Sequence, residues 1–525
     1  MLWQHKASEP IGTWQDVSED SRGLHVIGRP MSVPERTEML VSVADASHGV
    51  PASPELRSMI QSMLTNPASA VITPEHAELM KSLADIDRLM REDNEINGIL
   101  HALDGRYVRP APGGDLIRTP EVLPTGRNLH GFDPFRLPSA FAVKDGKRMA
   151  EQLLKRHISD GNQFPETIAM VLWGTDNLKN EGAPIAQALA LMGAKPRFDS
   201  YGRMAGAELL SLEEIGRPRI DVVITLSGIF RDLLPLQIKL LAEAAYLAAS
   251  ADEPVEMNFI RKHALAHQAE HGCDLETASL RVFGNAEGAY GSNVSHLIDN
   301  SRWDDADELA ETYTKRKGFA YGVNGRPVQH TALLKSVLCG VDLAYQNLDS
   351  VELGVTTIDT YFDTLGGISR AVKRAKGPDA PVAPVYISDQ TKGSGTVRTL
   401  TEQVALETRT RMLNPKWYEG LLKNGYEGVR QIELHVTNTM GWSATTGQVQ
   451  PWVYQKLTET FMLDPEMRER MAKLNPSASV QFAHRLLEAS RRNFWQPDTQ
   501  TLQALQQAGA ELEDRLEGVR EGLPA

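Results

Sequence analysis

Four irregular, glycine-rich segments carry the polar and aromatic side chains that could do chemistry. They are GRNLHGFD, NAEGAYGSN, TYFDTLGG and TNTMGWSATTGQVQPWVY, and they supply histidine, aspartate, glutamate, arginine and several aromatic rings. In sites for large, partly apolar ligands, rings give contact area and a few polar groups fix the orientation. The segments therefore predict a ligand of that kind, held by several loops at once.

Motifs for nucleotide binding and for nucleophilic hydrolysis are missing from the sequence. The loop at 391–399, TKGSGTVRT, could present backbone amides to an anion, but it lacks the G-K-[ST] ending of a P-loop. No G-x-G-x-x-G opens a helix after a strand, and no G-x-S-x-G occurs. We therefore expect no tightly bound cofactor, and the loop at 391–399 is then a turn at the start of a helix.

One group of histidines has the spacing of metal ligands. His263 and His267 lie at i and i+4 in RKHALAHQAEH, so that a helix would present both on one face, and His271 extends the stripe. A zincin needs Glu beside the first His, and position 264 is Ala. Surface or capping histidines are the commoner result of such spacing, so the sequence assigns no metal ligand.

The composition is that of an ordinary globular protein. The chain has 525 residues, 41% of them hydrophobic and 23% charged, and a formal net charge of -13. This acidic balance, without a basic run among aromatics, excludes nucleic acid as an expected partner. Cys273 and Cys339 are too few for a disulfide framework. The N-terminal residues carry no secretory signal, and charged residues interrupt the most apolar stretch at 233–250, so we expect a cytoplasmic protein rather than an integral membrane protein.

Alternating strands and helices must position the loops. The pattern predicts a strand at Thr167–Trp173, a helix at Ala183–Met192, a strand at Asp221–Leu226 and a buried amphipathic helix from Leu233 onward. Such alternation implies a parallel sheet, and open sheets of this kind bind ligands beyond the carboxyl ends of their strands. The loops GTDNLKNEG and SGIFRD follow these strands and are therefore candidate ligand loops.

A second pattern of the same type is expected further along the chain. Its strands are predicted at 351–358 and 382–387, and its helices at 367–376 and 397–412. The predicted fold class is α/β and multidomain, with Rossmann-like parallel-sheet units interleaved with helical segments and long Gly/Pro-rich loops. We expect six segments along the chain. Residues 1–92 should be mostly helical or irregular, and residues 93–145 should be rich in loops, beginning with a stretch that cannot hold a regular helix. An α/β unit is expected at 146–254, a helical segment at 255–350, a second α/β unit at 351–413 and a helical segment at 414–525.

Eight blocks of sequence, in order, resemble one protein family. They are RPAPGGDLIRTPEVLPTGRNLHGFDP, VLWGTDNLKNEG, RIDVVITLSGIFRDLLP, ADEPVEMNFIRKHALAH, EGAYGSN, YFDTLGGISRAV, NPKWYEGLLKNGYEGVRQI and MGWSATTGQVQPWVY. The family is that of the large, porphyrin-binding (H) subunits of magnesium chelatases, which is related to the large subunits of aerobic cobaltochelatases. The blocks span residue 93 to the C-terminus, and GRNLHGFDP, GIFRDLLPLQ and HVTNTMGWSA resemble the magnesium type and its bacteriochlorophyll branch.

The resemblance implies a metal-inserting enzyme. Its substrates would be Mg2+ and protoporphyrin IX, and two AAA+ type motor subunits would be its partners and hydrolyse the ATP, which agrees with the missing P-loop. Mg2+ prefers octahedral oxygen ligands and loses water reluctantly, while the porphyrin must lose two pyrrole protons. Carboxylate or imidazole groups could take those protons, and the motor subunits could distort or close the site.

Within this family resemblance, five residues are candidates for the site. Asp363 and Glu287 are acidic groups in glycine-rich turns, suited to ion handling or proton transfer, although a turn or N-cap carboxylate would look the same. Arg127 could pair with a porphyrin propionate, and His130 lies beside it. Trp442 could stack on the macrocycle, although a core position is the commoner role of such a ring.

Two departures from the family pattern leave alternatives open. The family's chains are much longer, so we expect a missing N-terminal half, which a separate chain could supply. The residue before TyrPheAsp is commonly His in the family and here is Thr360. The alternatives are a non-catalytic, truncated tetrapyrrole-binding paralogue and a cobaltochelatase large subunit acting on a corrin ring.

Overall fold

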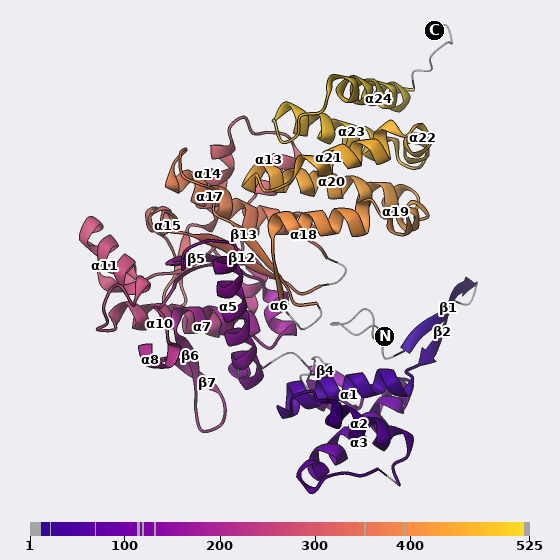
Figure 1. Cartoon of the computed structure of the whole chain (residues 1–525), viewed down its shortest axis with the longest axis vertical. Coiled ribbons are helices and arrows are strands. Elements are labelled where there is room, and N and C mark those ends of the chain that lie inside the picture. Colours follow the sequence, from indigo (N-terminus) through magenta and orange to yellow (C-terminus); the bar gives the residue numbers. More distant parts are fainter. Residues whose placement is uncertain are drawn as a thin grey trace.

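The first described elements form a small helical unit with its own core. The computed structural model describes residues 12–20, 23–68, 70–112, 116–117, 120–130, 133–350, 353–391 and 395–518. The unit consists of the hairpin β1 (Gly12–Asp20) and β2 (Gly23–Pro30) and the helices α1 (Val33–His48), α2 (Pro54–Thr65) and α3 (Ala77–Arg91). Leu40, Ile60 and Leu83 are fully buried between these helices. The unit lies at one end of the molecule, in indigo in Figure 1.

A mixed eight-stranded sheet forms the centre of the molecule, in the order β11-β10-β9-β8-β5-β12-β13-β14. The parallel central strands are β9 (Val282–Gly284), β8 (Asp221–Leu226), β5 (Thr167–Leu172), β12 (Leu343–Leu348) and β13 (Val385–Asp389). The antiparallel outer strands are β10 (Phe319–Tyr321), β11 (Pro327–Gln329) and β14 (Thr396–Thr399). Strands β8, β5 and β12 are buried along their whole length, as parallel strands covered on both faces should be.

Helices cover both faces of the sheet, and strand alternation divides the core between them. On β5, Ile168 and Met170 belong to one hydrophobic cluster, whereas Ala169 and Val171 belong to another, because successive side chains point to opposite faces. The first cluster includes α5 (Ala140–Ser159), α7 (Ala183–Met192), α10 (Pro235–Ser250) and α11 (Phe259–His271). The second includes α14 (Ala306–Lys317), α15 (Thr331–Leu338) and α17 (Gly367–Lys376).

The C-terminal helices extend the second cluster away from the sheet, in orange and yellow in Figure 1. They are α18 (Leu400–Glu407), α19 (Pro415–Leu422), α20 (Tyr426–Thr446), α21 (Pro451–Leu457), α22 (Pro465–Leu474), α23 (Pro476–Arg491) and α24 (Thr499–Glu517). Four of them begin with Pro, whose missing N–H costs nothing at a first helical position. Trp442, Phe461 and Phe482 join this layer to the sheet's core.

The predicted α/β architecture is confirmed. The elements predicted at Thr167–Trp173, Ala183–Met192, Asp221–Leu226 and from Leu233 are β5, α7, β8 and α9 (Gly228–Leu233) with α10. The two α/β patterns share one sheet. No helix in the described ranges is both long and apolar enough to cross a membrane.

Several predictions of local structure are wrong. The segments TYFDTLGG and TNTMGWSATTG, expected to be irregular, are helical: the first lies in the helical turns at 359–376 and the second in α20. The strand predicted at 351–358 is replaced by β12, and the described part of that range, 353–358, forms no strand. The sequence pattern missed β12 because this strand contains the buried polar residues Gln346 and Asn347. The range 353–358 forms no strand because the backbone N–H groups of Val355 and Thr356 donate to the Glu407 carboxylate instead of to a neighbouring strand. The stretch from residue 93 was expected to hold no helix, but it begins with α4 (Asn94–Leu103), capped by Asp93.

Candidate functional site

The carboxyl ends of strands β5, β8 and β12 bring the two nominated loops together. The Ser227 hydroxyl, directly after β8, accepts hydrogen bonds from the backbone N–H of Gly174 and of Phe230, each at 3.1 Å. These contacts join α9 to α6 (Gly174–Lys179). The order of the sheet changes direction beside β5, which is where open α/β sheets place their ligands. We call this region the strand edge.

A buried carboxylate without a hydrogen bond at one of its oxygens lies at the strand edge. Asp176 of α6 is 6% exposed, and its Oδ2 has no hydrogen-bond partner within the described residues. Burial, and then the nearby charge of Asp349 at the end of β12, raise the pKa of Asp176 to about 7. Asn180 donates to the Asp349 carboxylate and thereby fixes it. A carboxyl group of this pKa can gain and lose a proton near neutral pH.

Two aromatic rings stand beside the carboxylates. The rings of Trp173 and Tyr361 lie 5.2 Å apart between centroids, at 55°. Trp173 Nε1 donates to the side-chain oxygen of Gln346 on β12 at 3.1 Å. Burial, followed by the charges of Asp176 and Asp349, raises the pKa of Tyr361 far above its usual value, so its hydroxyl stays protonated. Tyr361 belongs to α16 (Asp359–Tyr361), which opens the TYFDTLGG segment.

The NAEGAYGSN loop packs against the SGIFRD loop. The Arg231 guanidinium donates to the carbonyls of Ala286 and Ala289, each at 2.6 Å, and lies 5.1 Å from the Tyr290 ring centroid. Gly228 allows this approach, because a Cβ there would lie 2.1 Å from a ring carbon of Tyr290. Glu287, a predicted site residue, is exposed on this loop. Its carboxylate is therefore accessible to ions and ligands in solution.

Asp363, the other predicted acidic residue, is buried and held by backbone amides. It lies in the π-helical turn Phe362–Gly366, and its carboxylate accepts from the N–H of Ser292 at 2.6 Å and of Ser295 at 2.9 Å. Ser295 belongs to α13 (Val294–Asp299), so Asp363 satisfies donors at the start of that helix. Burial lowers the pKa of nearby Lys317 to about 8, and the Asp363 charge opposes that shift.

The three predicted porphyrin contacts lie in different surroundings. The Arg127 guanidinium donates to the carbonyls of Pro124 at 2.9 Å and Leu123 at 2.9 Å, which braces the turn before it. His130 ends β4 (Asn128–His130), whose backbone pairs with β3 (Pro110–Pro112); its side chain lies outside the described part of the chain. Trp442 is fully buried on α20 and donates to the Val355 carbonyl at 2.7 Å. The structure thus places Trp442 in the core.

The histidine stripe on α11 is divided among separate partners. His263 Nδ1 lies 2.9 Å from the Asp221 carboxylate, and His267 Nδ1 lies 3.0 Å from the Ser336 hydroxyl. Among the described residues, no group of three or more His, Cys, Asp or Glu could hold a metal ion. The predicted anion loop at 391–399 lies partly outside the described residues, at 392–394.

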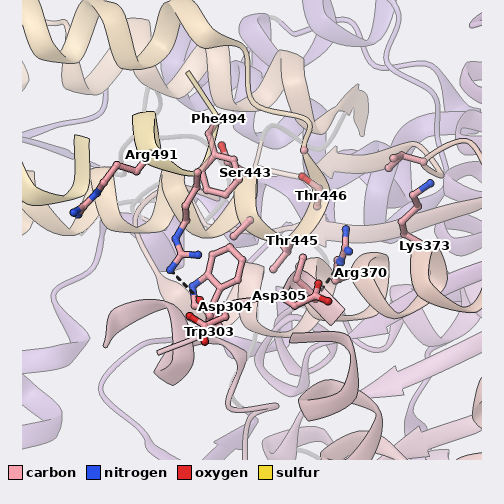
Figure 2. A pocket seen from close by; sticks show the side chains of 15 residues that line it. Trp303, Asp304, Asp305, Arg370, Lys373, Ser443, Thr445, Thr446, Arg491 and Phe494 are labelled. Atoms are coloured by element: carbon pink, nitrogen blue, oxygen red, sulfur yellow. Dashed lines mark hydrogen bonds between the residues drawn. The ribbon is translucent and has the colours of Figure 1, made fainter. Parts of the chain in front are cut away.

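A cavity of about 530 Å3 is lined in part by residues 443–447, the end of the TNTMGWSATTG segment. Figure 2 labels Ser443, Thr445 and Thr446 among the side chains that line it. Its cationic lining residues are Arg370, Lys373, Arg491 and Arg492. Three of the four already have partners within the chain: Arg370 donates to the Ala306 carbonyl, Lys373 to two carbonyls and Arg492 to the Glu488 carboxylate. None of the five predicted site residues lines this cavity. The strand edge is therefore the stronger candidate site.

A model of the family described as CobN/Magnesium Chelatase matches residues 65–502. The chain belongs to the CobN/magnesium chelatase family. The magnesium-chelatase H subunit of Rhodobacter capsulatus is 60% identical over 519 residues, which are 98% of this chain and 40% of that protein. The magnesium-chelatase H subunit of Cereibacter sphaeroides is 60% identical over 498 residues, 95% of this chain and 38% of that protein. The chain thus spans about two fifths of the length of these relatives.

A solved structure that is similar in sequence has the same fold. The catalytic subunit of cobaltochelatase from Mycobacterium tuberculosis matches with a TM-score of 0.75 at 31% identity. The match covers 94% of this chain and 45% of that one. The family resemblance seen in the ordered sequence blocks is therefore confirmed, in sequence and in fold.

Three residues of the strand edge in this family member were not predicted from the sequence. Asp176 lies inside the nominated loop GTDNLKNEG, but only the fold shows that it is buried beside a second carboxylate. Asp349 follows β12, the strand that the sequence pattern missed. Tyr361 stands two residues before the predicted Asp363. The signal that could have found Asp176 is its position four residues after an apolar strand of a parallel sheet.

Proposed function

We propose that this chain contributes part of the metal-inserting site of a magnesium chelatase, which inserts Mg2+ into protoporphyrin IX in bacteriochlorophyll synthesis. The observation that carries the proposal is 60% identity to a magnesium-chelatase H subunit across 98% of this chain. Two AAA+ type motor subunits are the proposed partners and hydrolyse the ATP. Because both cysteines are free thiols, a reducing, cytoplasmic location is part of the proposal.

The strand edge supplies the acid–base chemistry that metal insertion needs. The porphyrin releases two pyrrole protons when the ion enters, and a general base works best when its pKa lies near the working pH. Asp176, with a pKa of about 7, fits that requirement. The paired rings of Trp173 and Tyr361 supply aromatic area nearby, and, in addition to burial, the Asp176 charge helps to keep the Tyr361 hydroxyl protonated by raising its pKa. We assign proton acceptance to Asp176.

The residues predicted from the sequence take supporting roles in this proposal. Glu287 is exposed on a neighbouring loop and is the proposed first ligand of the incoming hydrated ion, since hard divalent cations prefer carboxylate oxygen. Asp363 is a positioning residue, because its oxygens already hold the amides of Ser292 and Ser295. Arg127 and His130 remain predicted porphyrin contacts, and His130→Ala tests this through the porphyrin dissociation constant.

The magnesium assignment is favoured over cobalt by relative similarity. The chain is 60% identical to two magnesium-chelatase H subunits and 31% identical to the solved cobaltochelatase subunit. We therefore expect Mg2+ and protoporphyrin IX to be the productive pair. Faster turnover with Co2+ and a hydrogenobyrinate-type corrin ring would support the cobaltochelatase alternative instead.

A fluorescence titration tests the proposed function. Protoporphyrin IX is added to the purified chain, first alone and then with both motor subunits, ATP and Mg2+. The expected result is saturable binding, followed by the shifted emission of the magnesium porphyrin. Binding without insertion would support the alternative of a non-catalytic tetrapyrrole-binding protein, and the absence of binding would contradict both functions.

A further inference from the structure

A second cavity lies on the helical layer of the sheet, away from the strand edge. It has a volume of about 430 Å3 and is bounded by α5, α7, β6 (Ala194–Phe198) and the segment around α8 (Leu212–Ile215). We call it the α5–α7 groove. None of its lining residues belongs to the loops of the strand edge. Its volume falls within the usual range for small-molecule pockets, about 300 to 1,000 Å3.

Most of the residues that line the groove are apolar. They have small or branched side chains, namely those of Val143, Ala150, Leu154, Ala186, Ala190, Ala194, Pro196, Leu210 and Ile215. The four alanines leave the space that larger side chains would fill. Such a surface gains free energy when an apolar body removes it from water. The walls therefore predict an apolar ligand body.

Four cationic residues also line the groove, namely Lys144, Lys147, Lys195 and Arg217. Lys144 and Lys147 stand on the same face of α5, and within the described residues neither ammonium group forms an ion pair or hydrogen bond. Arg217 is fixed at the end of α7, where it donates to the Ala190 carbonyl at 2.6 Å and the Leu191 carbonyl at 3.0 Å. Lys195 already forms an ion pair, with its Nζ 3.4 Å from Oε1 of Glu208. The two α5 lysines are therefore the charges available to a ligand.

Two acidic residues line the groove as well, and one of them has its own partner. The Glu214 carboxylate accepts from the Ser211 backbone N–H at 2.7 Å in a capping box. Glu151 is the other. Four cations against two carboxylates leave the lining net positive in a chain whose formal charge is -13. This local charge favours an anionic head group on the ligand.

We propose that the α5–α7 groove binds a small amphipathic organic acid, with its apolar body between α5 and α7 and its acidic group at Lys144 and Lys147. This site is separate from the strand edge and does not depend on the proposed metal insertion. The lysines fix orientation through charge-assisted hydrogen bonds, and the alanine-lined walls supply most of the contact area.

A binding experiment tests the groove with defined probes. The fluorescence of 8-anilino-1-naphthalenesulfonate is titrated with the full chain, and dodecanoate and dodecanol are compared as competitors. Ala190→Trp fills the groove, Lys144→Glu with Lys147→Glu reverses the charge, and Lys155→Glu is the control, an exposed position on the same helix that does not line the groove. Circular dichroism and thermal unfolding verify that each variant folds.

We expect dodecanoate to displace the probe and dodecanol to compete at least about tenfold less well, because only the acid pairs with the lysines. Ala190→Trp should abolish saturable binding, the double charge reversal should weaken it about tenfold, and Lys155→Glu should leave it unchanged. Equal binding in all variants, or equal competition by the alcohol, would overturn the proposal. Protoporphyrin IX binding should be the same in every variant; its loss in parallel would overturn the assignment of a separate site.

Discussion

Two buried carboxylates near the strand edge differ in what surrounds them. Asp363 has both oxygens bonded to backbone amides, at 2.6 Å and 2.9 Å, and so holds a glycine-rich loop at the start of α13. Asp176 lies beside a second carboxylate and keeps one oxygen without a hydrogen bond in the described structure. Burial is common to the two, so burial alone does not identify a reactive group. The satisfied carboxylate stabilises the fold, whereas Asp176 is the group to which we assign proton transfer.

The largest expected effect is that of Asp176 on the pH dependence of stability. Because the pKa of Asp176 is raised to about 7 in the folded chain, its contribution to stability is fully present below pH 4 and is lost as pH rises to 7. The loss amounts to as much as about 4 kcal/mol. Asp176→Asn should remove this dependence, as measured by urea unfolding at several pH values. An unchanged pH profile would contradict the assignment.

Asp363→Asn should destabilise the protein by about 1 to 3 kcal/mol, because an amide N–H2 would face the N–H of Ser292 or Ser295. Thermal and urea unfolding measure the change. Asp359→Asn is the matched control, since Asp359 is exposed one turn earlier. If Asp363→Asn kept full stability, its carboxylate would not be the structural group described here.

Trp442→Phe should cost about 1 to 2 kcal/mol of unfolding free energy, because the Val355 carbonyl loses its donor. The porphyrin dissociation constant should stay the same, since the indole is fully buried in the core. Unfolding and porphyrin titrations on one protein preparation check both points. Weaker porphyrin binding with unchanged stability would instead place Trp442 against the macrocycle.

The smallest expected effect is that of Glu287→Gln. The side chain is exposed, so stability should change by less than about 0.5 kcal/mol. If Glu287 collects the incoming ion, the Mg2+ concentration for half-maximal insertion should rise about threefold, the size of one exposed charge contact. A Mg2+ titration of the insertion rate measures this. If the Mg2+ concentration for half-maximal insertion stayed the same, Glu287 would not belong to the site.

The sequence predicted the sheet better than it predicted the site. Apolar runs such as Asp221–Leu226 marked the central strands, because parallel strands bury both faces. It missed β12, because Gln346 and Asn347 are polar yet hydrogen-bonded inside the core. The segments NAEGAYGSN and TYFDTLGG do contact each other, although TYFDTLGG is helical rather than a loop. Which acid among them is satisfied depends on amides contributed by distant segments, such as that of Ser292 to Asp363. Such contacts cannot be read from local pattern.

The most direct measurement of the central claim is the rate of magnesium insertion by Asp176→Asn. The chain is combined with both motor subunits, ATP, Mg2+ and protoporphyrin IX, and the magnesium porphyrin is followed by fluorescence. Asp379→Asn, at an exposed position, is the control. We predict about a thousandfold slower insertion with unchanged porphyrin affinity, the range expected for a lost general base. Insertion at the wild-type rate would contradict the role of the strand edge.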